Sequence, residues 1–158
     1  MIENKDVKIY MAGPWAKRAE CGELQKQLEA AGFTVVSRWI TKHIDMGQTA
    51  EDLNTTDVKV QEELTRQAIE DVLDLESADM FIIINSEKSE GKAFEFGYAC
   101  AMRLPIIVVG DRANNIFYQL PHVVVTPTLE EAIAVMNEAI ERQNAHDLAN
   151  QPKLIQEA

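Results

Sequence analysis

Basic residues and cysteines are scarce in this sequence of 158 residues, and each shortage excludes a class of function. Lys and Arg number 15 against 26 Asp and Glu, which gives a formal net charge of −11. This balance argues against a nucleic-acid polymer as partner, because such binding depends on cationic contacts to phosphates. The two cysteines, Cys21 and Cys100, form no disulfide framework, so we expect a protein of the reducing cytoplasm.

Long hydrophobic runs and cofactor motifs are also missing. No apolar run approaches the roughly 18 to 20 residues that a membrane span needs, so we predict no membrane partner. The N-terminal segment passes from polar residues into a strand pattern without the apolar region of a signal peptide. The histidines have no metal-ligand spacing, and neither a Walker loop nor a G-x-G-x-x-G fingerprint is present. We therefore predict no metal and no other cofactor.

What the sequence does contain is a regular alternation of apolar and helical segments. Hydrophobic residues make up 46% of the chain, enough for one domain with a real core. Short apolar runs separated by helices are typical of parallel strands covered on both faces. We predict an α/β fold with a flavodoxin-like or Rossmann-like, doubly wound, five-stranded parallel sheet in the order 2-1-3-4-5. Strands are expected at residues 7–13, 33–39, 79–84, 104–110 and 122–126, and helices at 17–31, 58–76, 91–102 and 129–142.

The predicted domain spans residues 1–142, and residues 143–158 form a C-terminal extension or tail because they are polar and have no strong period. Ligands of such sheets bind at the carboxyl ends of the strands. The candidate binding segments are therefore the residues that directly follow the strands, namely 13–15, 37–39, 85–91 and 110–115.

One of the predicted helices starts at this edge, in the stretch GKAFEFGYACAM (91–102). Between Lys92 and Arg103 it carries a single charge, Glu95. A carboxylate in the first turn should be ionised, because the helix dipole favours negative charge there. An ordinary first-turn glutamate needs no function, but the neighbours Phe94 and Phe96 favour a desolvated carboxylate suited to nucleophilic attack or acid–base work.

GKAFEFGYA resembles the signature of the nucleoside 2-deoxyribosyltransferase family, whose members carry a Gly, a catalytic Glu and a Gly-Tyr-Ala or similar triplet. The opening IYMAGPW is similar to the family's first strand and loop, and the resemblance covers roughly Lys8 to Phe117. Members exchange bases between deoxynucleosides or release the base from nucleoside 5′-monophosphates. The resemblance implies that Glu95 attacks the anomeric carbon and forms a covalent glycosyl-enzyme, as in retaining glycosidases. It also implies that Tyr10 aims Glu95, although Tyr10 is otherwise a plain aromatic strand residue.

The departing base needs a proton or a hydrogen bond, because an anionic base leaves poorly. The family uses an aspartate 24 residues or slightly more before the nucleophile, which implies Asp71. Asp74, one turn further on the same helix face, is the reserve candidate. Asp79 opens the next strand, and we expect a structural role for it.

Ser89 indicates which substrates the site accepts. Family transferases have an aspartate at this spacing that contacts the sugar 5′-hydroxyl, whereas the nucleotide hydrolases have a serine that binds the 5′-phosphate. A carboxylate would repel a phosphate, whereas a hydroxyl and the free amides of Gly91 and the helix start would bind it. Glu90 weighs against this interpretation, and so does Pro14, which stands where the hydrolases use a serine.

Other positions at the same edge have two interpretations each. Lys17 and Arg18 are candidates to replace the missing serine of the first loop. Trp15 and Trp39 either stack on the base or cap the core. Asn115 resembles a family asparagine delivered from a neighbouring subunit to the sugar, which implies a homodimer or higher homo-oligomer with a shared active site; otherwise it is a turn asparagine.

We therefore predict an N-glycosidase that cleaves the base–sugar bond of a (deoxy)nucleoside 5′-monophosphate through a covalent intermediate on Glu95, which water resolves. Gly13 joins the substrate-binding residues, and base contacts are expected from Thr41–Thr56. The alternatives are a nucleoside 2-deoxyribosyltransferase that exchanges bases between deoxynucleosides, and a nucleotide-binding sensor without turnover. The expected partner in every case is a small nucleotide or nucleoside.

Overall fold

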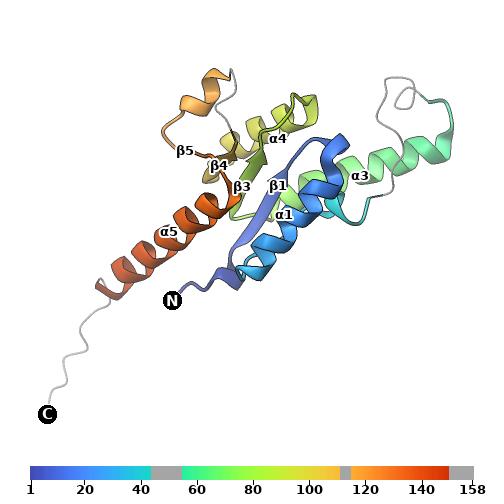
Figure 1. Ribbon diagram of the computed structural model, residues 1–158. Coiled ribbons are helices and arrows are strands. Elements are labelled where there is room, and N and C mark those ends of the chain that lie inside the picture. Colours follow the sequence, from blue (N-terminus) through green and yellow to red (C-terminus); the bar gives the residue numbers. More distant parts are fainter. Residues whose placement is uncertain (44–54, 111–114, 150–158) are drawn as a thin grey trace, which may run out of the picture.

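The computed structural model describes residues 1–43, 55–110 and 115–149. Its centre is one parallel sheet with the strand order β2-β1-β3-β4-β5, and every neighbouring pair of strands is parallel (Figure 1). The predicted fold class and strand order are thereby confirmed. The strands are β1 (Lys8–Ala12), β2 (Thr34–Val35), β3 (Met80–Ile84), β4 (Ile106–Val109) and β5 (Val123–Thr126).

Helices cover both faces of this sheet. The α-helices are α1 (Arg18–Ala30), α3 (Val58–Glu76), α4 (Glu90–Ala101) and α5 (Leu129–Ala149), and short 3-10 helices are η1 (Asn4–Asp6), η2 (Trp15–Lys17), η3 (Arg38–Ile40) and η4 (Ile116–Gln119). Asn4 links α1 to α5 on one face, since its amide donates to Ala31 O at 2.8 Å and to Asn137 Oδ1 at 3.0 Å. On the other face, Tyr98 of α4 donates to Glu76 of α3. In Figure 1, α3 and α5 reach beyond the sheet on opposite sides.

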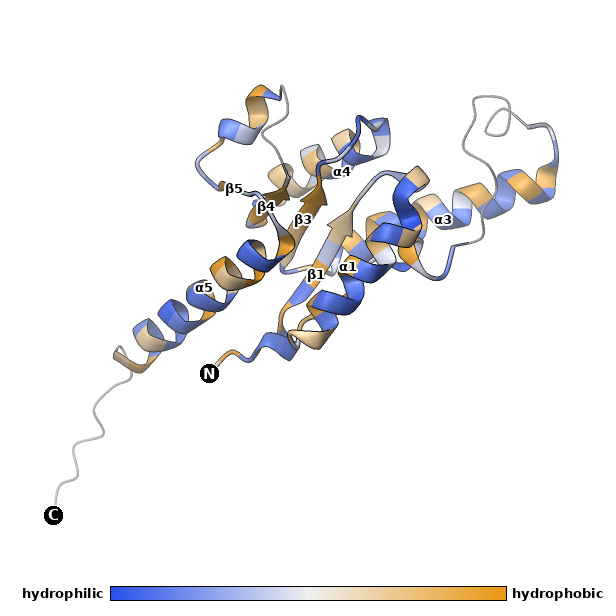
Figure 2. Ribbon diagram, viewed as in Figure 1, coloured by the Kyte–Doolittle hydropathy of each residue, from blue (hydrophilic) through white to orange (hydrophobic). Residues whose placement is uncertain are grey.

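Apolar strands and polar caps explain where these elements form. All four residues of β4 are buried, and β3 and β4 are the most hydrophobic strands in Figure 2. Helix α3 begins after Asp57, whose Oδ1 accepts the N–H groups of Lys59 at 2.9 Å and Val60 at 3.4 Å. The chain leaves α1 at Gly32, whose φ of +93° lies in the region that favours glycine.

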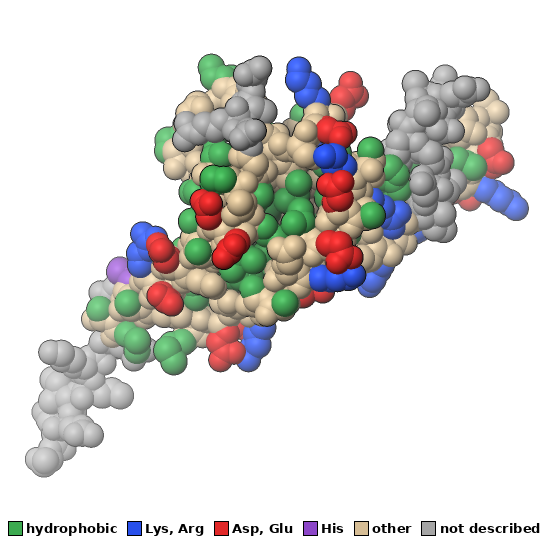
Figure 3. All heavy atoms as spheres, in the orientation of Figure 1, with side chains coloured by type: hydrophobic (Ala, Val, Ile, Leu, Met, Phe, Trp, Pro, Cys, Tyr) green, Lys and Arg blue, Asp and Glu red, His purple; other side chains and the backbone are tan. Residues whose placement is uncertain are grey.

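Two boundaries differ from the prediction by more than two residues. The strand expected at 33–39 ends at Val35, because Ser37 Oγ takes over the β1 edge by accepting Met11 N–H at 2.6 Å and the chain then turns into η3. The last helix continues past 142 to Ala149. Charged side chains gather along α1 and α5 on the face seen in Figure 3, with hydrophobic side chains between the two helices. Within the described ranges, no helix is both long and apolar enough to cross a bilayer.

Candidate active site

Tyr10 and Glu95 meet on the face of the sheet covered by α3 and α4. Tyr10, on β1, is fully buried, and its ring stacks on Phe81 with the centroids 6.0 Å apart. Its hydroxyl donates to Glu95 Oε1 at 2.5 Å. Burial raises the pKa of Tyr10 far above its usual value, so the phenol keeps its proton. Tyr10 is therefore a fixed donor to the carboxyl of Glu95.

Glu95 lies in the second turn of α4, not the first, because Ser89 caps a helix that starts at Glu90. The prediction of an ionised Glu95 rested on a position in the first turn, and that position is wrong. Burial raises the pKa of Glu95 to about 8, and the negative charge of Asp71 adds to this rise, whereas the hydrogen bond from Tyr10 opposes it. Glu95 consequently holds its proton at neutral pH in the free protein.

Asp71 projects from α3 close enough for its charge to act on Glu95. Its Oδ1 is buried and has no hydrogen-bond partner among the described residues. Burial, together with the charges of Asp74 and Glu70, raises the pKa of Asp71 to about 7 against the opposing effect of Arg38. A carboxyl group that titrates near neutral pH is suited to general acid catalysis.

The two other aspartates have structural partners. Asp74 is 6% exposed and accepts the backbone N–H of Arg38 at 2.9 Å and its Nε–H at 2.8 Å. Asp79 accepts Lys8 N–H at 2.9 Å and donates its own N–H to Lys8 O at 2.8 Å, at the start of β1. The bonds from Arg38 engage Asp74 in holding η3 against α3. Asp71 is therefore the α3 carboxyl that acts on Glu95.

Sequence reasoning gave His43 no metal-ligand role and included it only in the base-contact segment Thr41–Thr56, and the structure places it beside Asp71. The side chain is 2% exposed, with Nε2 3.1 Å from Glu70 Oε2 and Nδ1 3.8 Å from Asp71 Oδ1. Burial lowers its pKa, so the ring is neutral at pH 7. No spacing in the sequence signals this contact, because it joins the end of η3 to α3. No group of three His, Cys, Asp or Glu side chains in the described ranges could hold a metal ion.

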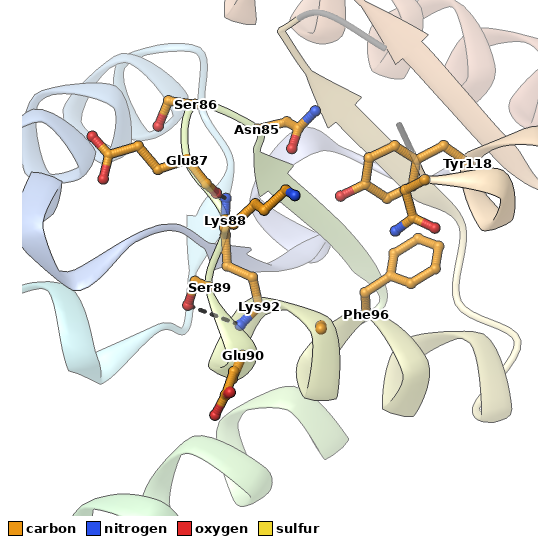
Figure 4. Close-up of a pocket in the computed structure, with 11 residues that line it drawn as sticks. Asn85, Ser86, Glu87, Lys88, Ser89, Glu90, Lys92, Phe96 and Tyr118 are labelled. Atoms are coloured by element: carbon orange, nitrogen blue, oxygen red, sulfur yellow. Dashed lines mark hydrogen bonds between the residues drawn. The ribbon is translucent and has the colours of Figure 1, made fainter. Parts of the chain in front are cut away.

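Ser89 lines a cavity of about 720 Å³ between the loop after β3, α4 and η4, whereas Gly91 is not among the lining residues. Ser89 Oγ accepts Lys92 N–H at 3.4 Å, and Gly91 is exposed. Figure 4 shows Asn85 facing Tyr118 across this cavity, with Phe96 beside Tyr118. The cavity residues are Asn85, Ser86, Glu87, Lys88, Ser89, Glu90, Lys92, Ala93, Phe96, Asn115 and Tyr118, and Glu95 is not among them.

Lys92, which sequence reasoning considered only as one of several basic groups able to serve a phosphate, fastens the loop after β3. It is 4% exposed, and its ammonium donates to Ile84 O at 3.1 Å and to Glu87 O. Lys17 reaches the same loop through Glu87, at 3.6 Å. Arg18 is occupied elsewhere, since it donates to the backbone oxygens of Ile40 at 2.7 Å and His43 at 2.6 Å.

The first loop and its tryptophans pack mainly as structure. Trp39 is 5% exposed, and its indole N–H donates to Met11 O at 2.8 Å. Of the two interpretations, base stacking and capping of the core, this position fits the second. Trp15 is half-buried, 6.2 Å from Trp39 between ring centroids. A Cβ at Gly13 would lie 2.5 Å from Cys21 Sγ, which explains a residue without a side chain there.

Asn115 caps η4 by accepting Phe117 N–H at 3.0 Å, and it lines the cavity of its own chain. The resemblance implies delivery to a neighbouring subunit, so its position here is closer to the alternative interpretation as a turn residue. The predicted base-recognition segment Thr41–Thr56 falls largely on residues 44–54, which lie outside the described residues, as do residues 150–158 of the predicted tail.

Solved structures share this arrangement of sheet and helices. The chain is similar to a conserved protein from Enterococcus faecalis V583, with a TM-score of 0.57 and 14% identity over 84% of this chain and 98% of that one. It is similar to a 2-deoxyribosyltransferase of Bacillus psychrosaccharolyticus, with a TM-score of 0.55 and 16% identity over 80% and 90% of the two chains. For the CMP N-glycosidase BcmB of Clostridium botulinum the TM-score is 0.50, with 19% identity over 82% and 98%.

At these identities the structures establish the fold, and the sequence itself establishes the family. No curated protein is a significant match. The family model described as Nucleoside 2-deoxyribosyltransferase, however, matches residues 9–146, a range that contains Tyr10, Asp71, Ser89 and Glu95. The match confirms the resemblance inferred from GKAFEFGYA, and the chain belongs to the nucleoside 2-deoxyribosyltransferase family.

Proposed function

We propose that the protein is an N-glycosidase that hydrolyses the base–sugar bond of a (deoxy)nucleoside 5′-monophosphate. The observation that carries this proposal is the 2.5 Å hydrogen bond from the Tyr10 hydroxyl to Glu95, near Asp71, whose Oδ1 is buried. One carboxylate aimed by a fixed donor and a second carboxyl that titrates near neutral pH are the two groups that a retaining mechanism requires. Membership of a family of base-transferring and base-releasing enzymes supports the same reaction class.

In the proposed first step, Glu95 attacks the anomeric carbon as a carboxylate while Asp71 gives its proton to the departing base. A covalent glycosyl-Glu95 ester forms, and the base–sugar bond breaks. Water then adds to the anomeric carbon, its proton returns to Asp71, and Glu95 leaves as a carboxylate. The reaction restores both groups and requires one proton on the pair, located on Asp71.

Proton location is the electrostatic requirement of this mechanism. Burial raises the pKa of Glu95 to about 8 and that of Asp71 to about 7, so near pH 7.5 the interacting pair binds about one proton. In the free protein this proton resides mainly on Glu95, because Glu95 has the higher pKa of the two. The hydrogen bond from Tyr10 favours the Glu95 carboxylate instead, and a substrate that displaces water from the site would strengthen this bond.

Ser89 supports a phosphate at the sugar end. Its hydroxyl accepts one backbone N–H, at 3.4 Å, and can donate its own proton to a phosphate oxygen. The start of α4 directs its partial positive charge to the same place, and Lys92 adds a cation behind the loop. Glu90 is exposed, so its charge is screened by solvent.

We also propose that the active unit is at least a homodimer. Ile116 and Phe117, next to Asn115 on η4, are 78% and 60% exposed, an apolar pair suited to burial against a second copy. Light scattering should report a dimer for the protein and a monomer for the Ile116→Ser/Phe117→Ser variant. A monomer in both cases would contradict the shared site.

The proposed reaction is tested by chromatography of the free base after incubation with nucleosides and their 5′-monophosphates, in both ribo and deoxy forms. Release from monophosphates only, abolished in Glu95→Gln and retained in the matched Glu90→Gln, is the expected result. Base exchange with unphosphorylated deoxynucleosides would replace the proposal by the transferase. Stoichiometric binding without release, unchanged in Glu95→Gln, would replace it by the sensor.

A further inference from the structure

The contact between His43 and Asp71 has no role in the mechanism above. We propose that His43 is a positioning residue that helps to move the proton of the Glu95–Asp71 pair from Glu95 to Asp71 when substrate binds, by accepting a hydrogen bond from the protonated Asp71 carboxyl. This inference rests on the proposed role of Asp71 as the general acid.

The contact between His43 and Glu70 determines which ring nitrogen of His43 carries the proton. Burial raises the pKa of Glu70, but the hydrogen bond and charge of Arg66 outweigh this effect and hold the pKa below its usual range. An ionised carboxylate only accepts hydrogen bonds. The 3.1 Å contact therefore requires His43 Nε2 to carry the ring proton.

The other ring nitrogen is then fixed as well. A neutral imidazole with its proton on Nε2 presents a lone pair on Nδ1, the atom that faces Asp71 Oδ1 at 3.8 Å. A lone pair repels a carboxylate and accepts from a carboxylic acid. The buried Oδ1 of Asp71 has no other hydrogen-bond partner in the described ranges, so the protonated state gains the most from this neighbour.

The surrounding groups hold this geometry on both sides. Arg18 anchors the backbone of His43 by donating to its carbonyl at 2.6 Å. Glu70 is held by Arg66 at 2.6 Å and lies 3.5 Å from Arg38. The titratable and charged groups that interact with His43 or Asp71 include Glu63, Arg66, Glu70 and Asp74 of α3, Arg38 of η3, Glu95 of α4 and Tyr10 of β1.

A distance of 3.8 Å exceeds a hydrogen bond, and closing it requires a movement of less than about 1 Å. Hydrogen bonds of catalytic groups are often long in the free enzyme and shorten when substrate binds. With Tyr10 favouring the carboxylate on Glu95 and His43 favouring the acid on Asp71, the two neighbours move the shared proton in the same direction. This is the direction that the proposed reaction needs.

Two variants separate the two ring nitrogens. In His43→Gln the amide reaches the position of Nε2 and keeps the Glu70 contact, whereas in His43→Asn it reaches the position of Nδ1 and keeps the Asp71 contact. We expect His43→Gln to lower kcat/KM for a nucleoside monophosphate at least about tenfold and to move the alkaline limb of its pH profile to lower pH. His43→Asn should recover most of the activity, and His122→Gln, at an exposed histidine, should not differ from the unaltered protein.

A substrate with 4-nitrophenolate in place of the base needs no proton on its leaving group, so both His43 variants should hydrolyse it at nearly the unaltered rate. Equal losses with both substrates would show that His43 is merely structural. Failure of the unaltered protein on both substrates would refute the proposed function instead.

The inference also has a test without turnover, by NMR titration of the folded protein. We expect the ¹⁵N signals of His43 to report a proton on Nε2 at pH 7. The ¹³C signal of the Asp71 carboxyl should show a lower pKa in His43→Gln than in His43→Asn. A proton on Nδ1, or an unchanged Asp71 pKa, would overturn the inference whatever the activity.

Discussion

The buried carboxyl of Glu95 makes a prediction about stability that needs no substrate. Because folding raises the pKa of Glu95 from 4.5 to about 8, the folded state binds this proton more tightly than the unfolded state. Its contribution to stability is therefore complete below the unfolded pKa and is lost as the pH rises through the folded pKa. In Glu95→Gln this loss is absent, and the amide can still accept the Tyr10 hydroxyl.

The magnitude follows from the two pKa values. At about 1.4 kcal/mol for each unit of pKa, the full loss at alkaline pH is about 5 kcal/mol, an upper bound. Since the Glu95 residue as a whole is only half-buried, water can relieve part of the penalty on its carboxyl. We therefore expect the unfolding free energy of Glu95→Gln to exceed that of the unaltered protein by about 2 kcal/mol near pH 9 and to match it near pH 5.

Urea unfolding at several pH values measures this difference directly. Glu90→Gln, an exposed position on the same helix, is the matched control and should change the unfolding free energy by less than about 0.5 kcal/mol at every pH. A difference between Glu95→Gln and the unaltered protein that does not grow with pH would refute the argument that Glu95 is desolvated.

Three further perturbations test single contacts. Tyr10→Phe removes the donor 2.5 Å from Glu95, so kcat at neutral pH should fall about tenfold or more and the acidic limb of the pH–rate profile should move to higher pH; an unmoved limb would contradict this. Gly13→Ala places a Cβ 2.5 Å from Cys21 Sγ and should destabilise the protein by about 1 to 3 kcal/mol in thermal melts, partly reversed in Gly13→Ala/Cys21→Ala. No reversal would mean that other contacts dominate. Lys92→Met frees the loop after β3 and should raise KM for a monophosphate about tenfold with little change in kcat, a result that equal losses with unphosphorylated nucleosides would exclude.

The sheet could be predicted because its information is local. The MFIII and IIVV runs are apolar on both faces, which only a strand covered by helices tolerates. The strand expected at 33–39 failed for the opposite reason. Ser37 pairs with Met11 across the sheet, a contact between segments distant in sequence that ends β2 early.

The site divides in the same way. Glu95, Tyr10 and Asp71 were found from a family motif and its spacing, and the structure brings them together. The protonation of Glu95 could not be predicted, because it arises from burial in the packed molecule and from the charge of Asp71. His43 and Lys92 have ordinary sequence surroundings, and their roles exist only in the packed molecule, where neither side chain is exposed.

The covalent intermediate on Glu95 is the central claim, and mass spectrometry of protein quenched during turnover of a deoxynucleoside 5′-monophosphate tests it most directly. We predict a mass increase of one sugar phosphate, located by peptide mapping on Glu95 and absent from Glu95→Gln. An unmodified protein that nevertheless turns over, or an adduct on another residue, would contradict the claim.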